Sequence, residues 1–211
     1  MTEISAQLVR ELRDKTNAGM MDCKKALQES SGDLDKAIEY LRKKGLKDIS
    51  KRATKDAREG TVHTYLHTGG RVGVMLELNC ETDFVARNAE FTELANAVAM
   101  HVAWAKPRFL DRESVPANVI AKESEIFRSQ LKPEQEKMAD KIVTGRLEKF
   151  FTENCLVEQL DARDPQGKRT IGSMLNEHSA KVGEKVVLRR FIRFELGEEL
   201  EATTGEKSSA Q

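Results

Sequence analysis

Cysteine and histidine are the residues of this chain whose side chains could do covalent or metal chemistry. The thiols are Cys23, Cys80 and Cys155, and two histidines, His63 and His67, lie four residues apart. In a strand, residues four apart point to the same face, so the two imidazoles would share one surface. A thiolate beside an imidazole suits nucleophilic catalysis, and imidazoles on one face suit a metal ion.

The spacing supports neither chemistry well. The histidine pair has no third ligand nearby, and the chain contains no Cys-x-x-Cys or His-Glu-x-x-His pattern. Cys80 falls at the end of an alternating segment and Cys23 on the apolar side of a helical one, where thiols are usually buried and inert. His101 flanks an apolar stripe and is more typical of packing or partner contact than of a general base. We predict no metal, no cofactor and no enzyme; a thiol or metal hydrolase using Cys80 with His63 or His101 is the third hypothesis.

Composition excludes further classes. The sequence has no GxxxxGK[ST] or GxGxxG loop, so we expect no direct nucleotide binding by those routes. Its 35 basic and 35 acidic residues cancel, which implies no bulk attraction to nucleic acid or membrane. No apolar run approaches the roughly 18 residues of a membrane helix, and the N-terminus resembles neither a signal nor a transit peptide. An odd number of distant cysteines favours reduced thiols, so we expect a cytoplasmic protein.

The first 45 residues predict three short helices. Ile4, Leu8 and Leu12 recur at helical spacing on one face, and turn formers interrupt the pattern at 16–19 and 30–33. Gly45 is the expected end of the third helix. A bundle of this size has little room for a cleft, so we expect residues 1–45 to form a partner-binding domain.

Basic residues dominate from Arg42 to Arg58, where eight lysines and arginines stand against two aspartates. We interpret residues 46–59 as a solvated, basic helical linker between two domains. Direct RNA contact by this segment is the alternative. It would make the chain a ribosome- or RNA-associated binding protein, whose RNA affinity would fall steeply with salt.

From residue 60 the apolar period changes to two. Val62–Leu66 and Val72–Leu78 alternate on either side of a Thr-Gly-Gly-Arg turn and predict an antiparallel hairpin. Apolar residues on both faces of 186–196 indicate a central strand of the sheet. We expect an α+β core over 60–197 and a disordered tail over 198–211. Helices are expected over 88–103, 116–131, 133–154 and 171–180, the middle two as a helical hairpin.

Two methionines at a helix start are typical of a protein contact. Met20 and Met21 follow Gly19, and a small three-helix bundle has few core positions to bury both. Exposed methionine suits adaptable apolar contact, and Arg13 and Lys24 could flank it with positive charge. The alternative is that both methionines fill the small core.

The second candidate contact is Thr82-Asp83-Phe84-Val85, where an alternating segment ends and a helix begins. The pattern alone favours an N-cap at Thr82 or Asp83, with Phe84 tucked beneath the helix. The alternative is an exposed apolar tip beside a carboxylate at the end of a rigid strand. Such a tip suits insertion into another protein and suits catalysis poorly.

Longer stretches of the sequence resemble a known family. Residues 16–27 (TNAGMMDCKKAL) and 77–86 (ELNCETDFVA) closely resemble the two signature stretches of bacterial elongation factor Ts. The segments 100–103 (MHVA) and 190–195 (RFIRFE) are similar to that family as well, and the resemblance runs from about Leu8 to Gly197. Asn17 stands where the family more often has glycine. The length resembles the short form, with one core module, which is associated with homodimers.

The resemblance implies a fold and a function. The fold is a three-helix domain of the ubiquitin-associated type, followed by an α/β core whose small antiparallel sheet is covered by helices. The function is guanine nucleotide exchange on elongation factor Tu, which promotes GDP release during translation elongation.

The resemblance also implies site residues. Asp83 and Phe84, flanked by Thr82 and Val85, would intrude near the magnesium site of the GTPase and displace its phosphate-loop region. His101 would lie near the same intruding surface. A second group of residues would hold another helix of the GTPase: Arg13, Met20, Met21 and Lys24.

Overall fold

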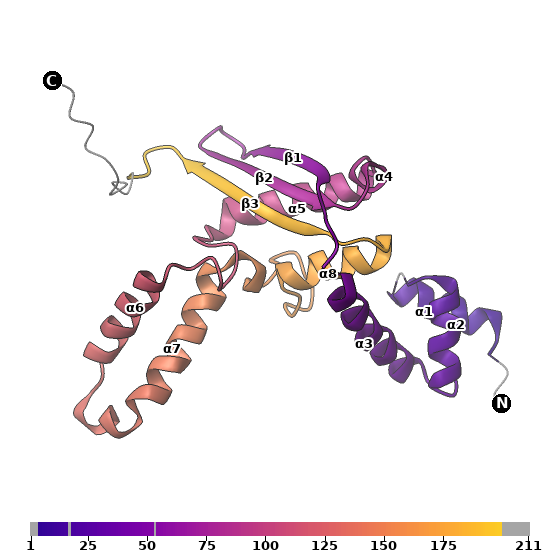
Figure 1. Ribbon diagram of the computed structural model, residues 1–211, viewed down its shortest axis with the longest axis horizontal. Coiled ribbons are helices and arrows are strands. Elements are labelled where there is room, and N and C mark those ends of the chain that lie inside the picture. The colour runs from indigo at the N-terminus through magenta and orange to yellow at the C-terminus, as the bar shows by residue number, and fades with distance from the viewer. Residues whose placement is uncertain (1–3, 17, 53, 200–211) are drawn as a thin grey trace.

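The computed structural model describes the backbone of residues 4–16, 18–52 and 54–199, and the side chains of these residues except 45–52. Figure 1 shows three parts: N-terminal helices, a sheet with helices beneath it, and a projecting helical pair. Asn17 and residues 200–211, which include most of the segment predicted to be disordered, lie outside the described residues. None of the described helices is long and apolar enough to cross a bilayer.

The N-terminal part is the predicted three-helix bundle. It consists of α1 (Ala6–Thr16), α2 (Met20–Glu29) and α3 (Leu34–Arg52). The bundle closes around the fully buried side chains of Leu12, which the apolar spacing places inward, and Leu27. Its core is small, so part of the apolar content of α2 stays on the surface.

Gly45 does not end the third helix, as the sequence had suggested, because α3 continues to Arg52. A glycine within a helix costs about 1 kcal/mol relative to alanine, which tertiary contacts can offset. Here α3 packs against α8 (Ile171–Val182) of the core. The helix therefore joins the bundle to the core directly, and β1 begins at Glu59. The division into domains at 1–45, 46–59, 60–197 and 198–211 stays a prediction.

The core contains a three-stranded antiparallel sheet in the order β1 (Glu59–Leu66), β2 (Val72–Cys80), β3 (Val187–Glu195). The β1–β2 hairpin confirms the predicted period of two, and Tyr65 pairs with Val74 in its register. Gly69 and Gly70 supply the left-handed backbone of the turn, with φ of 87° and 67°.

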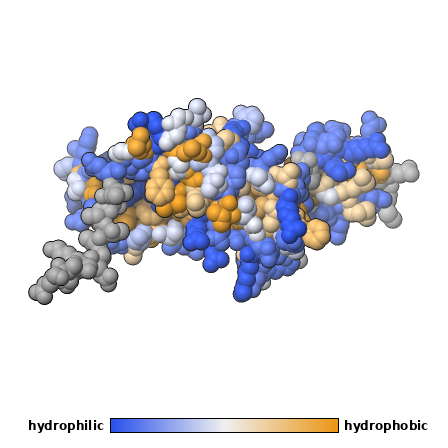
Figure 2. Space-filling model, turned by 90° about the horizontal axis from the view of Figure 1, so that it is seen from above, coloured by the Kyte–Doolittle hydropathy of each residue, from blue (hydrophilic) through white to orange (hydrophobic). Residues whose placement is uncertain are grey.

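The prediction that 186–196 is a central strand is wrong, because β2 is central and β3 is an edge. The apolar residues on its second face have another cause. Ile192 pairs with Met75 and points away from the core, and the same face carries exposed apolar side chains on all three strands. We call it the outer sheet face; it consists of Val62, Leu66, Met75, Ile192 and Phe194. Figure 2 shows hydrophobic side chains gathered there.

The inner face of the sheet forms the main core. α5 (Ala89–Ala105) lies across it and contributes the buried Phe91 and Val98, which pack with Leu76 and Leu78 of β2. Asn88 caps α5 by accepting a hydrogen bond from the Glu90 backbone N–H at 3.0 Å. A short helix, α4 (Asp83–Ala86), joins β2 to α5.

The projecting pair is α6 (Ala117–Ser129) and α7 (Ala139–Asn154), which pack on each other as the predicted helical hairpin. The turn between them includes the 3₁₀ helix η1 (Pro133–Met138), and η2 (Leu156–Glu158) follows α7. Arg112 braces the base through ion pairs with Glu148 at 2.7 Å and Glu158 at 2.5 Å. The fold class, α+β with three N-terminal helices and a helix-covered antiparallel sheet, is confirmed.

Candidate partner-binding site

Phe84 lies on the surface, where 86% of it is exposed. It belongs to a segment that leaves β2 after Cys80 and turns at once into α4. The interpretation from the pattern alone, in which Phe84 tucks beneath the helix, is therefore wrong. An aromatic ring on a sharp turn at the end of a central strand forms an apolar protrusion, and we call residues 82–85 the tip segment.

Each neighbour of Phe84 has a separate structural task. Thr82 is the predicted N-cap, and its hydroxyl accepts a hydrogen bond from the Val85 backbone N–H at 3.5 Å. Val85 is partly buried and packs against the main core. The exposed Asp83 carboxylate pairs with Arg87 one helical turn later, at 3.0 Å. The tip segment thus presents Phe84 and Asp83 outward and uses Thr82 and Val85 as its anchors.

Met20 and Met21 form a second apolar protrusion, which we call the methionine patch. Exposed fractions of 54% and 75% show that neither fills the bundle core. Lys24 lies one helical turn further along α2 and is exposed, as is Arg13 in the last turn of α1. Two exposed, adaptable apolar side chains thus share the bundle surface with exposed basic residues of α1 and α2. That Arg13 and Lys24 flank the methionines stays a prediction.

The structure does not bring His101 to the tip segment. α5 begins after the tip, and the twelve helical steps from Ala89 to His101 span about 18 Å along the helix axis. The His101 side chain is buried, and its Nε2 atom lies 3.0 Å from Oε1 of Gln159. Burial lowers the pKa of His101, so the ring is neutral at physiological pH.

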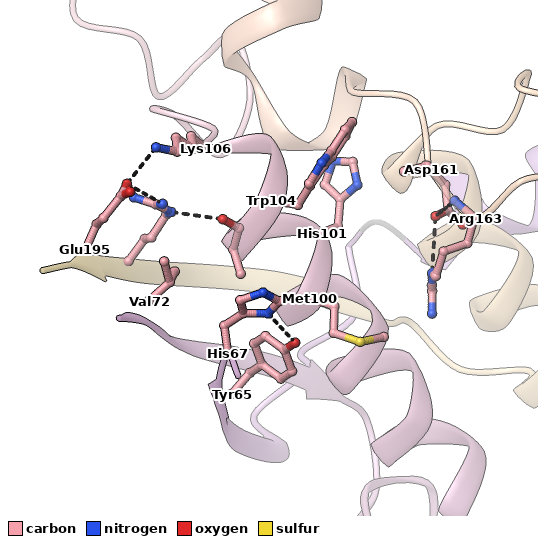
Figure 3. A pocket seen from close by; sticks show the side chains of 13 residues that line it. Tyr65, His67, Val72, Met100, His101, Trp104, Lys106, Asp161, Arg163 and Glu195 are labelled. Atoms are coloured by element: carbon pink, nitrogen blue, oxygen red, sulfur yellow. Dashed lines mark hydrogen bonds and ion pairs between the residues drawn. The ribbon is translucent and has the colours of Figure 1, made fainter. Parts of the chain in front are cut away.

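His101 lines a groove of about 470 Å³ at the far end of α5. Figure 3 shows Trp104 beside it, and the two rings meet edge to face with centroids 6.2 Å apart. Trp104 lies near the end of α5 and is 71% exposed. Lys106 and Arg193 both bond to Glu195 at the rim, and they lower the pKa of that carboxyl to about 2.

Comparison with known proteins gives one consistent family. Residues 2–198 match the family model described as elongation factor TS. The elongation factor Ts of Moorella thermoacetica is 55% identical over 197 residues, which cover 92% of this chain and 96% of that protein. Those of Desulforamulus reducens and Myxococcus xanthus are 54% and 52% identical, each over 203 residues, which cover 95% of this chain and 93% and 92% of the relatives.

The chain belongs to the elongation factor Ts family. It is therefore a nucleotide exchange factor of translation elongation, with elongation factor Tu as its partner, and not an enzyme. Exposed apolar protrusions on rigid supports suit that activity, because exchange proceeds through protein contacts and needs no covalent step.

The thiols of this elongation factor Ts family member are poor nucleophiles. All three cysteines are buried and free, and burial raises the pKa of Cys80 and of Cys155 to about 11. The Cys80 thiol donates a hydrogen bond to the Thr82 carbonyl at 3.1 Å, so it braces the tip segment. Among the described residues, no group of three or more histidine, cysteine or acidic side chains is placed to hold a metal ion.

The basic segment of this family member is largely paired with carboxylates where its side chains are described. Lys43 pairs with Glu39, Lys44 with Asp22, Lys55 with Glu81 and Arg58 with Asp56. The Lys47, Lys51 and Arg52 side chains lie outside the description. The described part thus provides no observation that favours RNA contact over a solvated linker.

Proposed function

We propose that the tip segment accelerates GDP release by inserting Phe84 beside the magnesium end of the nucleotide site of elongation factor Tu. The observation that carries this proposal is the 86% exposure of Phe84 on a turn that is anchored at both sides. Burying such a ring in a partner contributes on the order of 2 kcal/mol. Asp83, outward beside it, brings negative charge towards the magnesium and phosphate ligands.

Linkage explains how this contact drives exchange. A GTPase holds GDP through backbone donors on the phosphates and through a magnesium ion. If the factor binds the nucleotide-free form more tightly than the GDP form, it must weaken GDP binding by the same ratio. A side chain that displaces the phosphate-loop region produces that difference, because the displaced region is the one that GDP needs.

We propose that the methionine patch, with Arg13 and Lys24, is a second contact that orients the tip segment on the GTPase. It lies on a separate bundle that α3 connects to the core. His101 and the exposed Trp104 form a third candidate contact at the groove. His101 lies beyond reach of the Phe84 contact, so its role would concern another part of the partner.

A direct assay tests the function. Elongation factor Tu loaded with a fluorescent GDP analogue is mixed with excess GDP, with and without this chain. We expect catalytic amounts of the chain to raise the release rate by orders of magnitude, in the cytoplasmic setting of elongation that the family implies. An unchanged release rate would refute the function.

We propose further that two copies of the chain associate through the outer sheet face. Leu66 and Phe194 are 70% and 63% exposed there, on a face that no helix of the described chain covers. A contiguous apolar face of this kind marks a protein contact more often than a free surface. Since the opposite face is filled by α5, a second sheet would complete a layered packing.

A further inference from the structure

The tip segment is held by a carboxylate that lies 102 residues later in the chain. Glu184 follows α8, and its Oε2 atom accepts hydrogen bonds from the backbone N–H groups of Glu81 at 3.1 Å and Thr82 at 3.0 Å. Its Oε1 atom accepts a third bond from the Thr82 hydroxyl at 2.6 Å. Charge-assisted bonds of this kind are about twice as strong as neutral ones.

The connection is reciprocal. The Glu81 carboxylate accepts a hydrogen bond from the Lys185 backbone N–H at 2.7 Å, and it pairs with the Lys55 ammonium at 2.7 Å. The Lys185 ammonium in turn donates to the Lys55 carbonyl at 2.9 Å. Three distant segments thus meet at the base of the tip: the end of β2, the connection from α3 to β1, and the loop before β3.

The loop that carries Glu184 is itself fixed. Gly183 ends α8 with a left-handed φ of 77°, a conformation that glycine adopts without strain. The Ser179 hydroxyl donates to the Glu184 carbonyl at 2.5 Å. The carboxylate therefore stands in place before any partner arrives.

The tip needs such an external support. α4 has four residues, too few to be stable as an isolated helix. The last β1–β2 pair joins Glu59 to Cys80, so the N–H groups of Glu81 and Thr82 lie beyond that ladder. A mobile tip would have to be ordered on binding, and that ordering lowers affinity.

We propose that Glu184 is a positioning residue, which presets the tip segment so that Phe84 enters the partner without a prior ordering step. This inference rests on the proposed role of Phe84. Glu184 acts through the backbone of Glu81 and Thr82 and does not itself need to touch the GTPase. Glu81 supports it from the other side by fixing the Glu184–Lys185 peptide.

The first test is a double-mutant cycle in the GDP-release assay. Glu184→Ala should lower the stimulated release by about tenfold or more at limiting factor concentration. In a Phe84→Ala background the same substitution should have little further effect, because the side chain it positions is gone. Glu184→Gln, which keeps one acceptor oxygen, should recover part of the loss. Glu125→Ala is the matched control, since this exposed glutamate lies on α6, away from the tip.

The second test measures, without the partner, how firmly Glu184 holds the tip segment. In the free full-length chain, hydrogen exchange of a peptide over 79–85 should speed up in Glu184→Ala and not in Glu125→Ala. The positioning role would be overturned if Glu184→Ala left the hydrogen exchange of this peptide unchanged. It would also be overturned if Glu184→Ala reduced GDP release equally with and without Phe84. If Phe84→Ala leaves GDP release intact, the proposed function fails together with the positioning role. In that case, faster hydrogen exchange in Glu184→Ala would still show that Glu184 orders the tip segment.

Discussion

Phe84 and Val85 are adjacent in the sequence, yet one ring is 86% exposed and the other side chain packs into the core. The turn into α4 separates them, because successive helical residues point about 100° apart. The two side chains of this short segment therefore have different roles. Val85 fixes the segment to the protein, and Phe84 is free for a partner.

Replacing Phe84 should impair nucleotide exchange without affecting the stability of the fold. We expect Phe84→Ala to reduce stimulated GDP release by at least about thirtyfold, the effect of losing a hot spot worth roughly 2 kcal/mol. Its free energy of unfolding should change by less than about 0.5 kcal/mol, because an exposed ring makes few internal contacts. Stopped-flow release and urea denaturation measure the two quantities.

Val85→Ala provides the converse comparison, since it removes methyl groups from the core and should lower stability by about 1 kcal/mol. Met138→Ala, at an exposed site on the projecting pair, should change neither quantity. Full activity of Phe84→Ala would contradict the proposed insertion.

The methionine patch should contribute more to the affinity of the chain for elongation factor Tu than to the rate of GDP release from the bound complex. We expect the double substitution Met20→Ala and Met21→Ala to raise the factor concentration needed for half-maximal release by about tenfold, because the patch orients the factor without entering the nucleotide site. The maximal release rate at saturating factor should change little. A titration of factor against release rate separates the two, and a fall only in the maximal rate would argue against an orienting role.

A charge on the outer sheet face should keep the copies apart. Phe194→Asp is expected to shift the chain to a monomer in sedimentation equilibrium, because association would have to bury an unpaired carboxylate. Ile126→Asp introduces the same charge at an exposed apolar site on α6 and serves as the control. A wild-type chain that sediments as a monomer at high concentration would refute the proposed homodimer.

The sequence predicts most of the elements, because local patterns determine them. The helical spacing of Leu12 and the alternation through β2 were sufficient for the bundle and the hairpin. Strand order was not predictable in the same way. Apolar residues on both faces of β3 are compatible with a central strand or with an uncovered face, and only the tertiary arrangement distinguishes them.

The same limit applies to the site. The exposure of Phe84 depends on how α4 sits against β2, and its pattern alone favoured burial. The support from Glu184 joins positions 102 residues apart, and a single sequence carries no signal for it. The exposure of Trp104 was not predictable either, because its neighbours along α5 are apolar, whereas the groove beside it is lined by residues of all three strands and of the 161–163 loop.

The burial of His101 should make stability depend on pH. Because burial lowers its pKa below the ordinary value, the unfolded chain binds a proton at a higher pH than the folded chain does. The His101 contribution to the free energy of unfolding is therefore fully present above the unfolded pKa of about 6.5. It is lost as pH falls below that value, by at most about 1.4 kcal/mol per pH unit.

His178, which burial affects in the same direction, adds a similar contribution. Substitution with Gln removes the titration of one ring, so His101→Gln should flatten, but not abolish, the decline in urea midpoint between pH 7.5 and 5.5. Burial opposes ionisation of the nearby Asp161, but hydrogen bonds from the Arg163 backbone N–H and the Arg169 guanidinium lower its pKa, so that carboxylate stays charged throughout this range. An identical pH slope in wild type and His101→Gln would show that the proton uptake on unfolding arises elsewhere.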